Sequence, residues 1–433
     1  MASEPAETEP APAEPLRVGA TEADAARNLA MGAGIVDDPY PVFHELLQQC
    51  PVEKGSLGKH FPNPMSRRFE GIVEDRTVTV HGYEPGVEAL RQADVLSSEG
   101  FYGPALNMAI GKSVIGMDEP EHRRMRLLLQ PAFAKMKMER WKGDIIQPVV
   151  DEHLLRIKPL GRADLYEEVA PNVPVQTIGV ALGLPGEDQR KFFDWAVGMT
   201  SGGDVLGNSA AVAEYVAPLI AERRVDPKND LLSLLVEARI EDTDADGMSD
   251  SRPLTDEEVN IFVRLLIIAG AGTTYKAYGN LMFMLLSHPE QLAAVRDDRA
   301  LVAAAIEESL RIEQPLASVQ RVAVSDTTVG GVPVAEGCPV AVNIGAANHD
   351  PAQWGIEPEA FDIHRDRPDR HLSFGFGIHR CLGIHLARAE LSVLLNRTLD
   401  LLPNVRFDPD QPRPHITGLM FRMPTAVPAV WDT

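Results

Sequence analysis

Cys381 lies in the segment FGFGIHRCLG, residues 374–383, whose residue types could hold a metal ion. A deprotonated cysteine is a metal ligand, and glycines such as Gly377 and Gly383 let the backbone pass close to a flat ligand. The pattern also predicts a helix that begins near Leu382. The positive end of that helix would lower the pKa of the thiol, and its N–H groups could donate to the sulfur. The segment therefore predicts a metal-bound thiolate.

Two other interpretations of Cys381 compete with this one. Zinc could recruit His379, Cys381 and His385, but one cysteine without a second Cys/His cluster is weak evidence for such a site. A free cysteine is also often simply buried. The glycines and the predicted helix start favour the metal-bound thiolate over both.

The same ten residues closely resemble the haem-binding signature of the cytochrome P450 family, the haem-thiolate monooxygenases. The resemblance implies haem b (iron protoporphyrin IX) as cofactor and Cys381 as axial ligand of its iron, an arrangement established for that family. It also implies that Phe374, Gly375 and Gly383 lie against the haem. The resemblance extends over roughly residues 38–433.

A second matching segment is MDEPEHRRMR, residues 117–126. His122 and Arg126 are four positions apart, so they share one face of a helix and could meet one anionic group. The resemblance implies that this group is a haem propionate and that Arg321 and His379 contact the propionates as well. Basic residues on an ordinary surface are the alternative interpretation.

A third segment, ESLR, places Glu308 and Arg311 on one helix face. Alone such a pair indicates a solvated surface. Further along the chain, FDIHR resembles the segment that supplies the third member of the family's network, Arg365. The implied role of the three residues is structural, holding the haem pocket in shape.

The segment AGAGTT, residues 269–274, matches the family's helix on the oxygen-binding face of the haem. Small residues such as Ala269 leave room for dioxygen, and Thr273 matches the threonine whose hydroxyl relays protons during oxygen activation. Most members carry an acid just before that threonine, where this chain has Gly272. Water beside Gly272, or the neighbouring Tyr275, is the expected substitute. A smaller departure is His349, where members usually have arginine.

The elements around these segments are mostly helical, and long helical patterns cover most of residues 120–312. A valine-rich stretch broken by GG and EG, residues 322–345, predicts hairpins, and a last helix is expected over residues 382–402. Residues 97–116 are expected to form a loop that lines a pocket. We expect a mainly α fold with small β-sheets, the cytochrome P450 fold. This would be one triangular-prism-like domain over residues 31–433, with haem between the long distal helix and the cysteine loop, after a disordered acidic tail over residues 1–30.

Charge and cysteine content narrow the classes of function. The formal net charge is −22, from 63 acidic and 41 basic residues, which disfavours nucleic acid as a partner. Three cysteines cannot form a disulfide framework, so a reducing, cytoplasmic compartment fits best. The apolar stretch over residues 265–286 contains Lys276 and Asn280, which favour a core helix over a membrane anchor. We expect a monomer.

The implied activity is insertion of one oxygen atom from dioxygen into an apolar small molecule, by hydroxylation or oxidative dealkylation. Electrons would come from a separate ferredoxin and a ferredoxin reductase using NAD(P)H, because no flavin or iron–sulfur motif occurs in the sequence. The alternatives are a peroxide-using relative, suggested by Gly272, and a haem protein that only binds a ligand. Family topology suggests these pocket walls: Phe101, Tyr102, Leu106, Met108, Leu265, Ile268 and Val319. A basic surface for the electron donor would combine Arg123, Arg124, Lys135, Lys137, Arg380 and Arg388.

Overall fold

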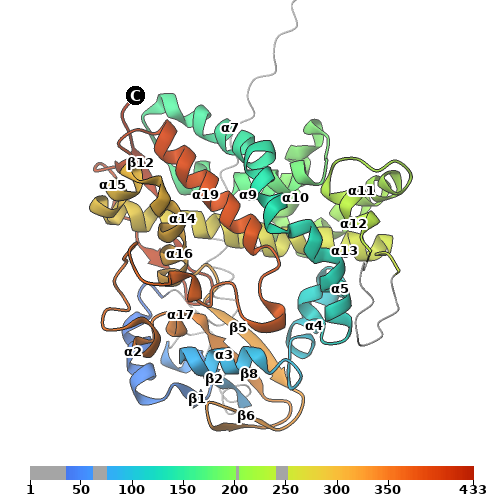
Figure 1. Cartoon of the computed structure of the whole chain (residues 1–433), viewed down its shortest axis with the longest axis vertical. Coiled ribbons are helices and arrows are strands. Elements are labelled where there is room, and N and C mark those ends of the chain that lie inside the picture. The colour runs from blue at the N-terminus through green and yellow to red at the C-terminus, as the bar shows by residue number, and fades with distance from the viewer. Residues whose placement is uncertain (1–35, 62–75, 201–203, 240–251) are drawn as a thin grey trace, which may run out of the picture.

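The computed structural model describes residues 36–61, 76–200, 204–239 and 252–433. The predicted tail over residues 1–30 lies outside this range. Helices form the upper part of the molecule in Figure 1, and the largest sheet lies in the lower part with α2 and α3. The expected architecture, mainly helical with small sheets, is confirmed.

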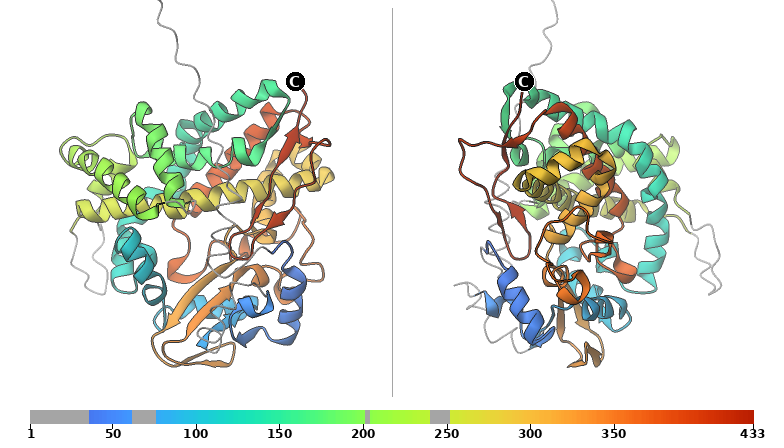
Figure 2. Two further views of the ribbon diagram at one scale, coloured as in Figure 1. Left: turned by 180° about the vertical axis from the view of Figure 1, so that it is seen from behind. Right: turned by 60° about the vertical axis from the view of Figure 1, so that its left-hand side comes forward.

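One long helical segment crosses the molecule from side to side (Figure 2). It consists of α13 (Asp256–Leu266), a π-helical turn (Ile267–Ala271) and α14 (Gly272–Ser287). Its first turn is fixed by a reciprocal cap, in which Glu258 N donates to Thr255 Oγ1 and Thr255 N donates to the Glu258 carboxylate. Most of its side chains are buried on all sides, as expected for a helix through the core.

The other helices pack around this segment and share one large apolar core. Within the described residues, no helix combines the length and the apolar character that crossing a membrane requires. The remaining helices are α2 (Tyr40–Gln49), α3 (Tyr83–Arg91), α4 (Glu99–Ala109), α5 (Glu121–Leu129), α6 (Lys135–Trp141), α7 (Gln147–Ile157), α8 (Leu165–Glu168), α9 (Asn172–Ala181), α10 (Gln189–Thr200), α11 (Val205–Val225), α12 (Leu231–Glu237), α15 (Pro289–Asp297), α16 (Val302–Ile312), α17 (Ile344–Ala347), α18 (Pro351–Trp354) and α19 (Ile384–Leu401).

The largest sheet has the strand order β1-β2-β8-β5-β3, and only the β2–β8 pair is parallel. Helix α3 packs on it through Val87 and Leu90. The hairpin predicted at GG is present, and Gly330 and Gly331 take positive φ at the turn between β6 and β7. The hairpin predicted at EG is wrong, because among the described strands β7 pairs only with β6, while β8 pairs with β2 and β5. The strands are β1 (Val52–Lys54), β2 (Val78–Val80), β3 (Leu96–Ser97), β4 (Arg162–Asp164), β5 (Ser318–Ala323), β6 (Thr327–Val329), β7 (Val332–Val334), β8 (Pro339–Asn343), β9 (Arg406–Phe407), β10 (Ile416–Thr417), β11 (Met423–Pro424) and β12 (Pro428–Val430).

The predicted loop over residues 97–116 is wrong in its main part, because α4 occupies Glu99–Ala109. The carboxylate of Asp118 accepts from the backbone N–H groups of Ser98 and Glu99, at 2.9 and 3.2 Å, and so satisfies the start of the helix. This cap comes from about twenty residues downstream. Local sequence, with its glycines and Pro104, gave no sign of it.

Candidate cofactor site

The cysteine loop is a tight turn closed by backbone hydrogen bonds. Cys381 N donates to Phe374 O at 2.8 Å, and Gly375 N donates to Leu372 O at 2.7 Å. Gly377 has a φ of 71°, and a Cβ atom there would lie 2.3 Å from the carbonyl oxygen of Leu90 in α3. Glycine is therefore required at position 377 by the backbone of α3, and not by a flat ligand as the sequence suggested.

Two other glycines of the loop border open space. A Cβ atom at Gly383 would meet no described atom within 4 Å, and one at Gly375 would meet only His379 O, at 3.9 Å. Phe374 is half-buried beside them, with its ring under the guanidinium of Arg388 at 5.1 Å. The backbone around Cys381 can therefore receive a flat group without a clash at Gly375 or Gly383.

The thiol itself behaves differently from the sequence prediction. Removal from water raises the pKa of Cys381, although the Gly383 N–H and the charges of Arg126, Arg380 and Arg388 act to lower it. The expectation that the helix end brings this pKa below its ordinary value is wrong, because desolvation outweighs the contribution of the Gly383 N–H. The predicted helix over residues 382–402 is confirmed, since α19 covers Ile384–Leu401. A coordinated metal ion would hold the thiol deprotonated.

The predicted anion-binding residues come together on one side of the loop. The rings of His122, on α5, and His379 lie 4.1 Å apart between centroids. Burial, together with the charges of His122, Arg321 and Arg126, lowers the pKa of His379 to about 3. Arg126 also interacts with Cys381. Four residues from three distant segments therefore share one electropositive region next to the cysteine.

This region has buried polar atoms without hydrogen-bond partners. His122 Nε2 and His379 Nε2 are buried, and neither has a hydrogen-bond partner within the described residues. Arg321 is 6% exposed, and its Nη1 donates only to the neighbouring carbonyl of Gln320, at 2.7 Å. Burial lowers the pKa of this guanidinium. A buried guanidinium and two buried imidazole nitrogens without partners fit an anionic ligand such as a haem propionate.

The middle of the long helix is open on one side. Ala269 is exposed and Ile268 and Thr273 are half-buried, whereas most of their neighbours are buried. Thr273 Oγ1 donates to Ala269 O at 2.9 Å across the end of the π-helical turn, a type of distortion often found at functional sites. These features, together with the glycines and open donors around Cys381, fit the haem that the resemblance implies.

Lys276 is a residue whose place in this site the sequence analysis missed. It is 1% exposed, and its Nζ donates to the Tyr275 hydroxyl at 2.7 Å and to Gly272 O at 3.2 Å. The signal was present, because a lysine within an apolar stretch must find polar partners when it is buried. In the sequence, Lys276 indicated only that this apolar stretch is not a membrane span.

Glu390 was also missed. It is 2% exposed on α19, and burial raises its pKa to about 8, while the nearby hydroxyls of Thr177 and Thr274 act in the opposite direction. Thr274 directly follows Thr273 on the long helix. The position of Glu390 among the buried apolar residues of α19 was the available signal.

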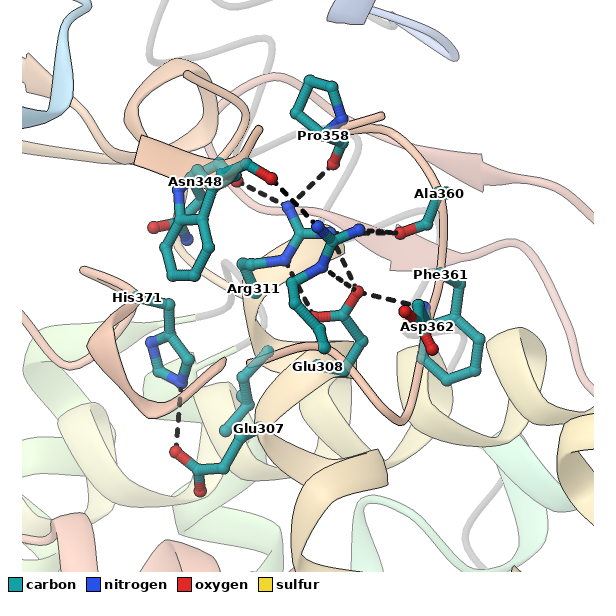
Figure 3. A network of polar contacts seen from close by, with 12 residues as sticks. Glu307, Glu308, Arg311, Asn348, Pro358, Ala360, Phe361, Asp362 and His371 are labelled. Carbon is teal, nitrogen blue, oxygen red and sulfur yellow. Dashed lines mark hydrogen bonds and ion pairs between the residues drawn. The ribbon is translucent and has the colours of Figure 1, made fainter. Parts of the chain in front are cut away.

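The predicted structural network is formed by the expected residues (Figure 3). The carboxylate of Glu308 accepts from Arg311 Nε at 2.8 Å and from Arg365 Nε at 2.9 Å. Arg311 also donates to the carbonyl oxygens of Asn348, Pro358 and Ala360. Glu308 and Arg311 are fully buried. The network therefore joins α16 to residues 348–365.

A second set of contacts ties the cysteine loop to α16. The carboxylate of Glu307 accepts from Arg388 Nε at 2.7 Å and lies 3.4 Å from His371 Nε2. Although burial acts to raise the pKa of Glu307, His371 and Arg388 bring it below its ordinary value. Ser373 Oγ donates to Leu310 O at 2.6 Å. The residues just before the loop and the helix that follows it are therefore both anchored to α16.

The suggested pocket walls are distributed over several elements. The Tyr102 hydroxyl accepts from Gln320 N at 3.0 Å, and Leu106 and Ile268 pack against the main core. Phe101 is 38% exposed and Met108 is 73% exposed, both on α4. Leu265 is buried, and Val319 on β5 is half-buried. Their contact with a substrate stays a prediction.

The zinc interpretation finds no support. Within the described part of the chain, no three His, Cys, Asp or Glu side chains are placed to hold a metal ion together. His379 and His385 therefore do not form a zinc site with Cys381.

Comparison with known proteins gives consistent matches. The family described as Cytochrome P450 matches residues 208–426. The chain is 33% identical to the cytochrome P450 monooxygenase PikC of Streptomyces venezuelae, covering 93% of each protein. It is 35% identical to cytochrome P450 107B1 of Saccharopolyspora erythraea, over 73% of this chain and 77% of that protein. The structure matches CYP109E1 of Bacillus megaterium in complex with testosterone, at a TM-score of 0.78 and 26% identity, over 92% of this chain and all of that one.

Proposed function

The chain belongs to the cytochrome P450 family and is a haem-thiolate monooxygenase that acts on small molecules, and on this premise we propose that Cys381 is the thiolate ligand. When bound, the haem supplies the iron at which dioxygen is activated. The observation that carries the proposal is the combination of the Cys381 turn, the open space at Gly375 and Gly383, and the electropositive region beside them. Cys50 and Cys338 instead donate to the backbone carbonyl oxygens of Val52 and Arg76.

The chain's own residues would divide the remaining tasks. His122, Arg126, Arg321 and His379 would hold the two propionates, because their donors face one buried region. Ala269 would leave space on the oxygen side. The Thr273 hydroxyl would hold a proton close to the reacting oxygen, next to the gap at Gly272. Phe374 would pack against the haem on the cysteine side.

We further propose an apolar substrate, because the suggested walls are mainly apolar: Phe101, Tyr102, Leu106, Met108, Leu265, Ile268 and Val319. A screen of small apolar compounds for the low-spin to high-spin change of the purified enzyme would find ligands. We expect at least one ligand to give an oxygenated product with NAD(P)H and donor proteins. Oxygenated product only with hydrogen peroxide would instead support the peroxide-using alternative that Gly272 suggests. Ligands that bind without any product would favour a binding protein.

Enzymes of this family receive electrons from redox partners, and we propose a ferredoxin with an NAD(P)H-dependent ferredoxin reductase, in the cytoplasm. The predicted basic surface changes in composition, because two of its members bind carboxylates of the chain itself. Arg124 pairs with Glu258 at 3.2 Å, and Arg388 pairs with Glu307 at 2.6 Å. The surface for an acidic donor would therefore consist mainly of Lys135, Lys137 and Arg380. Of these, Lys135 and Arg380 are exposed.

Charge reversal tests this surface. Lys135→Glu combined with Arg380→Glu should slow reduction by ferredoxin roughly tenfold at low salt, because electrostatic steering accelerates association by about 10–10³-fold. The difference should shrink as salt is added. Arg406→Glu, at an exposed position on β9, is the matched control and should reduce normally. Stopped-flow reduction rates over a salt series give the answer, and unchanged rates at low salt would remove this surface from the proposal.

A further inference from the structure

A lysine amine is buried inside the long helix segment next to the site of oxygen activation. Lys276 is 1% exposed, and its Nζ lies 4.1 Å from the ring centre of Tyr275 and 5.4 Å from that of Phe421. It donates to the Tyr275 hydroxyl at 2.7 Å. An ammonium group is costly to remove from water. The buried ammonium group of Lys276 therefore needs polar or aromatic partners, and Tyr275 and Phe421 supply them.

The amine lies beside Gly272, the position at which the predicted proton path lacks the family's usual acid. A Cβ atom at Gly272 would lie 4.0 Å from Lys276 Nζ, with no other atom beyond the adjoining backbone within that distance. Nζ also donates to Gly272 O at 3.2 Å. Gly272 directly precedes Thr273, whose hydroxyl is turned back to Ala269 O. The space at Gly272 thus has the Lys276 amine on one side. Thr273, the proposed proton-holding residue, is the next residue in the chain.

We propose that Lys276, assisted by Tyr275, supplies the protons that Thr273 passes on during oxygen activation. The proposal rests on the proposed role of Thr273. A proton would leave Nζ for a water molecule in the space at Gly272, and that water would pass a proton to the Thr273 hydroxyl. The neutral amine would then take the phenolic proton of Tyr275, and the phenolate would regain one from bulk water. Each cycle moves one proton inward and leaves both side chains unchanged.

A purely structural lysine is the competing explanation, and three variants separate the two. Lys276→Met keeps the length and apolar packing of the side chain and removes only the amine. Tyr275→Phe removes only the hydroxyl. It tests the same proton path if Lys276→Met does not fold. Gly272→Asp combined with Lys276→Met places a carboxyl in the space that Nζ borders. Haem content and thermal unfolding of every variant show that it is folded.

The first measurement is coupling, which is the amount of product formed per NAD(P)H consumed. Lys276→Met should lower it at least roughly tenfold, since general acid–base groups contribute about 10²–10⁴-fold. The added Asp at position 272 should restore most of it. Tyr275→Phe should lower it as well. Normal coupling in Lys276→Met or in Tyr275→Phe, or failure of the Asp to restore it, would overturn the proposal in favour of a structural role.

A second measurement needs no turnover. The C–O stretching frequency of carbon monoxide bound to the reduced protein responds to nearby charge, so Lys276→Met should raise it and Tyr275→Phe should change it less. An unchanged frequency in Lys276→Met contradicts the proposal. Thr273→Ala is the reference, because normal coupling there would refute the role of Thr273 itself. The carbon monoxide measurement would then still report on Lys276 separately.

Discussion

Cys381→Ser is expected to abolish the spectroscopic signature of thiolate ligation. The reduced protein with carbon monoxide should lose the red-displaced absorption band, because a serine hydroxyl does not replace thiolate as an electron-donating ligand. Loss of a residue that only supports a metal ligand typically lowers activity by about 10–100-fold. Loss of the ligand itself should therefore lower monooxygenase activity by more than about 100-fold. Absorption spectra and product formation measure both effects.

The chain offers matched controls for this substitution. Cys338 donates its S–H to Arg76 O at 2.7 Å, and Cys50 donates to Val52 O at 2.9 Å. Cys338→Ser and Cys50→Ser should keep the band and the activity, since a hydroxyl can make the same bonds. The turn itself should survive in Cys381→Ser because it is closed by the backbone N–H of residue 381. A Cys381→Ser protein with an unaltered band would refute the assignment of the ligand.

Local sequence located the site because its chemistry is concentrated in short segments. Cys381 with its glycines lies within ten residues, and Glu308 and Arg311 lie within one helical turn. In these cases residue type and spacing carry the geometry. The third partner, Arg365, is distant in sequence, and only the resemblance to a family placed it.

The features that local sequence could not give depend on contacts between distant segments. The cap that Asp118 provides to α4 turned an expected loop into a helix. Gly377 is required by the backbone of α3, which no pattern around residue 377 reveals. Arg388 looked like a free surface charge until Glu307 was found beside it. The same holds for the thiol pKa, where the helix end was visible in sequence but desolvation was not.

Glu308→Ala is expected to cost about 3–5 kcal/mol of folding stability, the range for removing one partner of a buried ion pair. The guanidinium of Arg311 is fully buried, so its charge would be left without a carboxylate. Urea unfolding of the holoprotein measures the loss. Glu121→Ala is the control, since Glu121 pairs with Lys112 at the surface, where an ion pair contributes about 0–1 kcal/mol. Equal stability of the two variants would contradict the structural role.

Removing both charges should not restore stability. In Glu308→Ala with Arg311→Met, the carbonyl oxygens of Asn348, Pro358 and Ala360 would lose the donors that Arg311 provides. Asn348 in turn accepts from Leu372 N at 2.8 Å and donates to Ser373 Oγ at 2.9 Å, at the start of the cysteine loop. Both variants should therefore release haem at lower urea than the polypeptide needs to unfold, which the haem absorption band and circular dichroism would show as two separate transitions. Recovery of wild-type stability in the double variant would mean that the network acts as an isolated ion pair and does not hold the loop.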